Sequence, residues 1–217
     1  MATFPSEIVE ALRQEHLCVL GGFSTEDPTE HALNPTVRSL ALIGPDEPSF
    51  WDHFKNSVEY NDGQPDPMDR WSKRVIENIS SKFGLKPYFP FGGPPFAPFY
   101  SWALKTGRIY ASPTKLLVHD TAGLFVSFRG ALGLPYHVDF DHEASPCTTC
   151  HKPCLSACPV DAFAEGTYNA TACRDELTSG DRQDCTGQGC AARRACPISQ
   201  RFARVDEQSQ FHMRSFI

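Results

Sequence analysis

The chain has 217 residues, of which 41% are hydrophobic, and a formal net charge of -6. This length allows one main domain with a sizeable core, and the absence of a basic stretch argues against nucleic acid as a partner. The N-terminus lacks the positive start and apolar block of a signal peptide, and no apolar run approaches the roughly 20 residues that cross a bilayer. We therefore expect a cytoplasmic protein without a membrane partner.

The first part of the chain predicts alternating helices and strands. A helix should begin at Ser6, which can cap it, and a short strand should follow over residues 18–24. Residues 37–45 form a short apolar run closed by Gly-Pro, which is typical of a central strand. A further helix should begin at Ser49 and break at Asn61. The apolar positions expected on the first helix are Ile8, Leu12 and Leu17.

The next helix has the clearest start and stop signals. Asp66 supplies a cap, Pro67 the first-turn position and Gly84 the stop. Its predicted buried stripe consists of Trp71, Val75, Ile76 and Ile79.

Residues 85–99 hold five prolines and five aromatic residues, which excludes a regular helix or a central strand. The segment is either a rigid loop that covers the core or one wall of a pocket for a flat ligand, because rings fixed by Pro and Gly backbone give a preorganised apolar surface. A short helix is expected over residues 99–105.

Residues 115–119 and 124–135 read as two strands joined by a turn, which predicts an antiparallel hairpin in the core. Strands and helices in this order favour an α+β sandwich. We place one domain boundary near residue 140, with residues 1–140 in the main domain and residues 141–217 in a smaller domain held by its cofactor.

Eight of the nine cysteines follow that boundary. The first four form the run C-x2-C-x3-C-x3-C-P, one residue longer than the bacterial iron-sulfur run C-x2-C-x2-C-x3-C-P, in which the last cysteine ligates the other cluster of a pair. With the interleaving of such runs, one cluster would take Cys147, Cys150, Cys154 and Cys196. The other cluster would take Cys158, Cys173, Cys185 and Cys190.

Other uses of these thiols remain open. A single cluster, a zinc site or disulfides would also use clustered cysteines, although only Cys147 and Cys150 form a compact C-x2-C zinc knuckle. In a reducing cytosol, ligand or redox roles are more common than structural disulfides. The ninth thiol, Cys18, is expected to be a small core residue.

Two blocks of sequence resemble a known family. The segments KLLVHDTAGLFVSFRGALGLP and CTTCHKPCLSACPVDAF, followed by YNATACRDEL, look like the second half of epoxyqueuosine reductases and their relatives, the corrinoid reductive dehalogenases. FRGALGLP is also similar to the cobalamin-processing chaperone of the methylmalonic aciduria type C group. The resemblance covers about residues 115–197.

This resemblance implies a nitroreductase-like α/β sandwich that holds a cobalamin and a C-terminal ferredoxin-like module with two [4Fe-4S] clusters. Arg129 resembles an arginine of the chaperone's glutathione-binding site, and His119 is the second candidate for binding a cofactor. Epoxyqueuosine reductases carry a catalytic Asp before a Gly-rich segment, whereas residues 89–115 contain no acid here. The resemblance therefore extends to fold and cofactors and not to queuosine chemistry.

The sequence thus predicts an electron-transfer protein or reductase, in which two clusters pass electrons from a redox partner protein to a ligand of the N-terminal domain, for which the resemblance implies a cobalamin. As an enzyme it would be a cobalamin-dependent or cobalamin-reducing oxidoreductase. The alternatives are a corrinoid or small-ligand chaperone with a structural cysteine module, and a simple ferredoxin.

Overall fold

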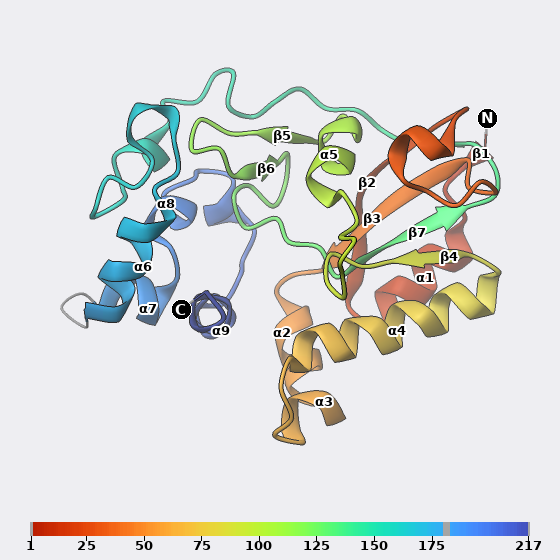
Figure 1. Cartoon of the computed structure of the whole chain (residues 1–217), viewed down its shortest axis with the longest axis horizontal. Helices are drawn as coiled ribbons and strands as arrows, with labels where there is room; N and C mark the ends of the chain where they lie inside the picture. The colour runs from red at the N-terminus through yellow and green to blue at the C-terminus, as the bar shows by residue number, and fades with distance from the viewer. Residues whose placement is uncertain (1, 180–182, 217) are drawn as a thin grey trace. The chain divides into compact units, whose positions relative to one another are not determined.

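The computed structural model describes residues 2–179 and 183–216 (Figure 1). The chain divides into two units, of which the first, here called the sheet unit, contains residues 1–109 and 127–143. The second, the cysteine unit, contains residues 110–126 and 144–217. The border after residue 143 lies close to the predicted boundary, but the structure adds residues 110–126 to the cysteine unit.

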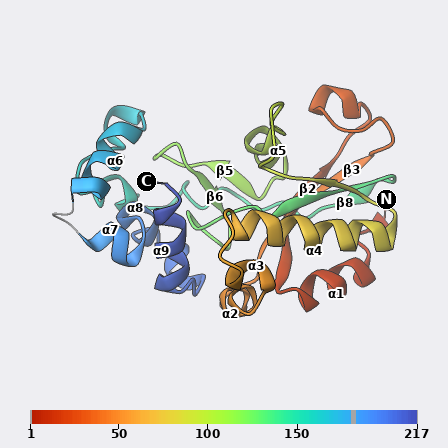
Figure 2. The same ribbon diagram turned by 60° about the horizontal axis from the view of Figure 1, so that its bottom comes forward.

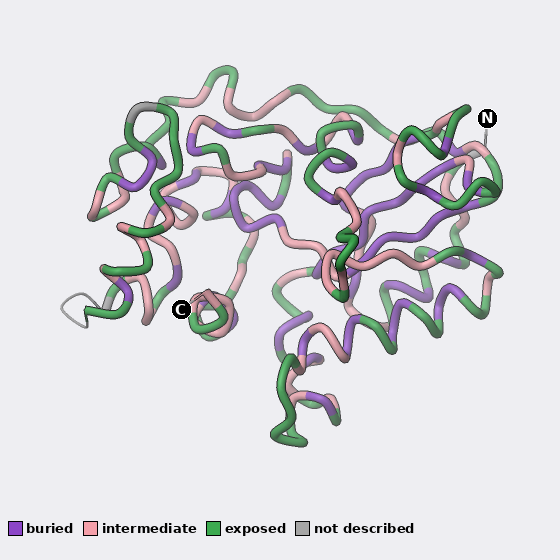
Figure 3. Tube along the Cα trace, in the orientation of Figure 1, coloured by how far each residue is buried: buried purple, intermediate pink, exposed green. Residues whose placement is uncertain are grey.

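An antiparallel sheet of four strands forms the centre of the sheet unit. Its order is β2 (Leu17–Ser24), β3 (Ser39–Pro45), β7 (Gly130–Leu134) and β4 (Lys86–Tyr88). Every residue of β3 is buried, which confirms the central strand that the apolar run predicted. Figure 3 shows the buried positions running along these strands.

Helices cover both faces of this sheet. Figure 2 shows α1 (Ser6–Gln14) and α4 (Pro67–Phe83) on one side and α5 (Phe99–Lys105) on the other. In α1, Ile8 and Leu12 are buried as predicted. Two details of that prediction were wrong, because Pro5 and not Ser6 is the N-cap, and Leu17 begins β2.

Helix α4 matches its sequence signals closely. The predicted stripe of Trp71, Val75, Ile76 and Ile79 is buried. Gly84 ends the helix with φ of +66°, the left-handed conformation that glycine adopts without steric cost. Asp66 occupies the N-cap position, but its side chain makes no capping hydrogen bond.

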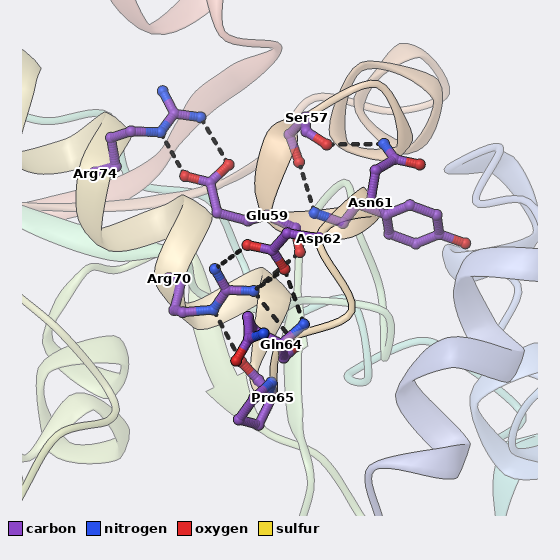
Figure 4. A network of polar contacts seen from close by, with 9 residues as sticks. Ser57, Glu59, Asn61, Asp62, Gln64, Pro65, Arg70 and Arg74 are labelled. Carbon is purple, nitrogen blue, oxygen red and sulfur yellow. Dashed lines mark hydrogen bonds and ion pairs between the residues drawn. The ribbon is translucent and has the colours of Figure 1, made fainter.

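The helix predicted from Ser49 to Asn61 is two helices, α2 (Ser49–Lys55) and α3 (Val58–Asn61). Ser57 interrupts the run, because its hydroxyl accepts a hydrogen bond from the Tyr60 N–H and caps α3. Two arginines of α4 then hold α3, as Figure 4 shows: Arg70 pairs with Asp62, and Arg74 with Glu59.

The predicted hairpin was wrong. Strand β6 (Leu117–His119) pairs with β5 (Ile109–Ala111), while β7 lies between β3 and β4 in the large sheet. All five residues of β7 are buried, so they fit the interior of a sheet better than one half of an isolated ribbon. An isolated bridge pairs His119, at the end of the first predicted strand, with Gly123 in the turn that follows.

The cysteine unit contains short elements around a small apolar core. Its helices are α6 (Ala170–Ser179), α7 (Gln183–Gln188), α8 (Ala191–Arg194) and α9 (Asp206–Arg214), and its 3-10 turns are Pro153–Leu155, Ala164–Gly166 and Ser199–Arg201. The core residues are Val118, Leu124, Cys154, Phe163, Ala192 and Cys196. The sheet unit additionally has a 3-10 turn, Pro28–His31, and a parallel pair of β1 (Ala2–Thr3) and β8 (Val138–Asp139).

The whole chain is a mixed α/β protein. Among the residues that the structure describes, no helix has the length and apolar character needed to cross a membrane.

Candidate functional site

The structure separates the eight C-terminal cysteines into two sets. All nine cysteines of the chain are free. A cavity of about 410 Å³ in the cysteine unit is lined by the first set, which consists of Cys147, Cys150, Cys154 and Cys196. A second, much narrower cavity of about 20 Å³ is lined by the second set, which consists of Cys158, Cys173, Cys185 and Cys190. These are the two groups that the interleaved pattern predicts.

Short loops and turns position the first set. Cys154 lies in the 3-10 turn Pro153–Leu155, and Cys196 comes two residues after α8. Both side chains are buried, whereas Cys147 and Cys150 are half-buried. The Lys152 N–H donates to the Cys150 sulfur at 3.3 Å, which folds the loop back over that ligand position.

Residues 110–126 complete the first cavity, a role that sequence reasoning missed. Val118 and Leu124 line it, and the Leu124 N–H donates to the Ser199 hydroxyl at 2.8 Å. Gly123 adopts a φ of +58°, and a Cβ there would stand 2.4 Å from the Ser199 nitrogen. This contact fixes the chain just after Cys196. In the sequence, the glycine at the end of the turn HDTAG, Gly123, is the feature that indicates such a close approach.

The second set is carried mainly by helices. Cys173 lies in α6, Cys185 in α7, and Cys190 is the N-cap residue of α8. Cys158, which precedes Pro159, accepts a hydrogen bond from the Ala162 N–H at 3.3 Å.

Burial is the largest influence on the pKa of Cys185 and of Cys173 and raises both, whereas the Ala191 backbone and the Tyr168 side chain act in the opposite direction. Burial, followed by the charge of Cys173, raises the pKa of Tyr168 to about 12.

The pKa shifts of the thiols also reflect the division into two sets. Burial first, and then the neighbouring thiolates of the same set, raises the pKa of Cys147, Cys154 and Cys173. For Cys154 the interacting thiolates are Cys196, Cys147 and Cys150. For Cys173 they are Cys190, Cys158 and Cys185. Near neutral pH these raised pKa values favour the protonated thiols, and a bound metal centre would supply the positive charge that stabilises their thiolates.

The spacing of the thiols bears on the kind of metal centre. Zinc binds four thiolates at about 2.3 Å from one ion. Within the described ranges 2–179 and 183–216, no three potential ligands lie close enough together to hold a single metal ion.

The two candidate cofactor contacts lie in different units. In the cysteine unit, His119 is buried, and its Nδ1 accepts hydrogen bonds from the N–H groups of Thr121 and Ala122. This imidazole therefore closes the turn that leads to Gly123.

Arg129 belongs to the sheet unit. Burial lowers the pKa of its guanidinium to about 10, against the opposite effect of Asp69 and Glu47. Its Nε is buried and has no hydrogen-bond partner within the part of the chain that the structure describes. Arg129 is thus a half-buried cation whose buried Nε has spare donor capacity, as a contact to an anionic ligand group would require.

The ninth thiol and the proline-rich segment both belong to the sheet unit. The Cys18 thiol lies in β2 and donates to the Pro45 carbonyl at 3.4 Å, and burial raises its pKa to about 12. It is an inert packing residue, as expected. In the segment after β4, Phe89 and Phe91 pack together at 5.2 Å while Phe96 is exposed, and neither of the two roles considered for this segment is tested.

Comparisons with known proteins give one structural relative. No protein-family model matches the chain, and no curated protein matches it by sequence. A crystal structure of selenomethionine-labelled epoxyqueuosine reductase is similar, with a TM-score of 0.52 and 15% identity. The match covers 94% of this chain and 69% of that chain. At this level of identity the similarity establishes a shared fold.

Proposed function

We propose that this chain is an iron-sulfur redox protein with two [4Fe-4S] clusters. The first set of thiols would hold one cluster and the second set the other. The observation that carries the proposal is the grouping of eight thiols, widely separated in sequence, into two sets of four around two separate cavities. Four converging thiolates are the usual ligand set of such clusters.

Each set offers four thiols to a cluster, but the cavities that the two sets line differ in volume. The first cavity, of about 410 Å³, has room for an inorganic group of several atoms. The second cavity, of about 20 Å³, accommodates little more than one water molecule, so its thiols would move apart when a cluster is inserted. Both clusters would supply one-electron redox chemistry, while the protein would set their potentials through burial and hydrogen bonds to sulfur.

We further propose that the sheet unit is a nitroreductase-like sandwich that accepts a corrinoid, and that the cysteine unit is a ferredoxin-like module that reduces it. The shared fold with epoxyqueuosine reductase and the FRGALGLP segment support this assignment. Arg129 would meet an anionic group of the ligand. A cytoplasmic redox protein would supply the electrons.

Metal analysis of anaerobically purified protein tests the main proposal. We expect a brown protein with a broad charge-transfer absorption and roughly eight iron atoms per chain. Colourless protein that contains zinc would overturn it.

Single substitutions then test the two ligand sets. Cys158→Ser should remove or alter the cluster of the second set and leave the other spectrum intact, and Cys154→Ser should do the reverse. Cys18→Ser is the matched control, because this buried thiol lies outside both sets. Loss of the same signal in both ligand variants would contradict the interleaved assignment.

Binding of cobalamin tests the corrinoid proposal separately. We expect the spectrum of added cobalamin to shift toward the base-off form, with weaker binding after Arg129→Met. An unchanged spectrum at high protein concentration would argue against a corrinoid ligand and leave the cluster assignment standing.

A further inference from the structure

Positively charged side chains lie where the first cavity meets the surface. Thr149, His151, Lys152 and Arg201 line this cavity and are exposed, and they are here called its rim. None of the described residues that line the cavity is an aspartate or a glutamate. The second cavity has the opposite character, because Glu176 lines it and, among the described residues, no lysine or arginine does. The two cavities thus differ in the charge around them.

The two cations of the rim are not engaged within the chain. In the ranges that the structure describes, neither Lys152 nor Arg201 forms an ion pair with a carboxylate. Two other arginines of the same unit are engaged, since Arg193 donates to a backbone carbonyl and Arg194 pairs with Asp184. The charges of Lys152 and Arg201 are therefore available to a partner in solution.

The rim also gives access to the thiols of the first set. Cys154 and Cys196 are buried, whereas Cys147 and Cys150 are half-buried and line the cavity together with the exposed Thr149. A group held by these four thiols would be enclosed around the two buried cysteines and approachable beside the other two. Electron transfer between proteins requires their redox centres to come close together, so the rim is a suitable place for a donor.

The charge of the rim favours one class of partner. Complementary charges steer an acidic protein toward a basic patch, and they speed the brief encounters that redox proteins make. A nucleic acid fits less well, because it requires a row of cations along its phosphates and this chain carries a net charge of -6. The rim therefore suits a small acidic electron carrier.

We propose that the rim around Lys152 and Arg201 is the docking surface for an acidic one-electron carrier protein, which reduces the cluster of the first set. This inference rests on the proposed function and names the donor for that cluster. In the step, one electron leaves the reduced carrier and enters the oxidised cluster. No bond forms or breaks.

Reduction by a plant-type [2Fe-2S] ferredoxin, an acidic carrier, tests the proposal. Reduced ferredoxin is mixed anaerobically with the cluster-loaded protein in a stopped-flow instrument at a series of ionic strengths. The second-order rate constant should fall as salt screens the attraction. Lys152→Glu combined with Arg201→Glu should lower this constant about tenfold at low ionic strength and remove most of its salt dependence. Lys152→Arg combined with Arg201→Lys keeps both charges and should restore the rate.

Three controls separate docking from the properties of the cluster. Lys73→Glu combined with Lys105→Glu makes the same change of net charge at exposed positions of α4 and α5, and should keep the rate within about twofold of the unmodified protein. Photoreduced deazaflavin, a small neutral donor, should reduce all variants equally fast. Gallium-substituted ferredoxin cannot donate an electron, and calorimetry should show that it binds the charge-reversed rim about tenfold more weakly.

The outcomes separate the two proposals. Absence of iron in the unmodified protein would overturn the proposed function. With iron present, equal slowing of ferredoxin and deazaflavin in the charge-reversed variant would show that the two cations only set the potential of the cluster, and the docking proposal would fall. Unchanged reduction by ferredoxin in that variant would also refute docking. Tighter binding of a single-stranded RNA than of ferredoxin at the same salt concentration would assign the rim to a nucleic acid instead.

Discussion

At the scale of single residues, the ion pair between Glu59 and Arg74 is a partly enclosed charge interaction. Its two hydrogen bonds, 2.5 Å and 3.0 Å long, join α3 to α4, and the Glu59 side chain is only 10% exposed (Figure 4). The hydrogen bond from Arg74 holds the pKa of Glu59 below its ordinary value of 4.5. A carboxyl whose folded-state pKa is lowered stabilises the protein above its unfolded pKa and loses this effect as the pH falls through the folded pKa.

We therefore predict that Glu59→Gln lowers the free energy of unfolding by about 1–2 kcal/mol at pH 7. The difference from the unmodified protein should shrink once the pH falls below 4.5, as Glu59 itself becomes protonated. Urea unfolding at a series of pH values measures both effects. Asp52→Asn is the control, because its carboxylate side chain is 82% exposed beside Lys55 and should contribute little. A difference that stays constant down to pH 2 would contradict the assigned cause.

Ser39 is a buried polar residue that connects two parts of the sheet unit. Its hydroxyl donates to the Tyr136 carbonyl at 2.9 Å and accepts from the Val138 N–H at 2.9 Å. It also pairs with Ser24 at 2.8 Å. The residue thus ties the return segment after β7 to strand β3.

Replacing Ser39 with Ala should lower the free energy of unfolding by about 1–3 kcal/mol, because buried partners lose a hydrogen bond. Chemical unfolding of the purified variant measures this loss. Ser81→Ala, at an exposed position of α4, should change stability by no more than about 0.5 kcal/mol. Equal stability of the two variants would show that Ser24 replaces Ser39 without cost.

At the level of elements, the ribbon of β5 and β6 with its following turn supports the first set of thiols. Gly123 leaves space for Ser199, and Arg193 donates to the Leu124 carbonyl. The short α8 that carries Arg193 ends just before Cys196. These contacts join residues 110–126 to the chain on both sides of the last ligand.

We predict that Gly123→Ala reduces occupancy of the first cluster and leaves the second in place. The added Cβ would collide with the Ser199 backbone, and alanine is also strained at a φ of +58°. Iron content and electron paramagnetic resonance should show close to half of the normal cluster content.

Gly187→Ala is the matched control, because no atom lies within 4 Å of a Cβ built there. Full occupancy of both clusters in Gly123→Ala would show that this turn does not position Cys196.

At the level of the whole molecule, the two units differ in how they are stabilised. The sheet unit buries three tryptophans and continuous apolar strands. In the cysteine unit the buried cluster around the thiols has six residues, two of which are cysteines, and Phe125, Val126 and Leu177 are buried as well. Small domains with a limited apolar core commonly depend on metal for their stability.

Removal of iron by a chelator should therefore affect the units unequally. Amide hydrogen exchange should accelerate in α6, α7 and α8, while β3 and α4 keep their protection. Mass spectrometry of peptides before and after chelation measures this difference. Acceleration throughout the chain would show that both units unfold together, and no change would show that the cysteine unit is stable without metal.

Local sequence signals predicted correctly those elements whose formation depends on residues close together along the chain. Helix α4 followed from its Pro67 start, its Gly84 stop and its four-residue apolar stripe, because these features act within one or two turns. The central strand β3 followed from a continuous apolar run. The interleaving typical of such cysteine runs also gave the two groups of thiols that line separate cavities, while their role as cluster ligands stays a prediction.

Local sequence signals could not predict which distant segments pair as strands. The sequence suggested a hairpin of neighbours, yet β7 pairs with β3 and β4, which lie far from it along the chain. The backbone of β7 pairs with a strand on either side, and no local signal says which strands these are.

The sequence by itself thus determined the main helices, the central strand and the eight thiols expected to bind metal. Tertiary structure decided that residues 110–126 belong with those thiols and that Arg129 and His119 lie in different units. The physical reason is that spacing and periodicity are written in the chain, whereas contacts across long loops depend on which surfaces can be buried together.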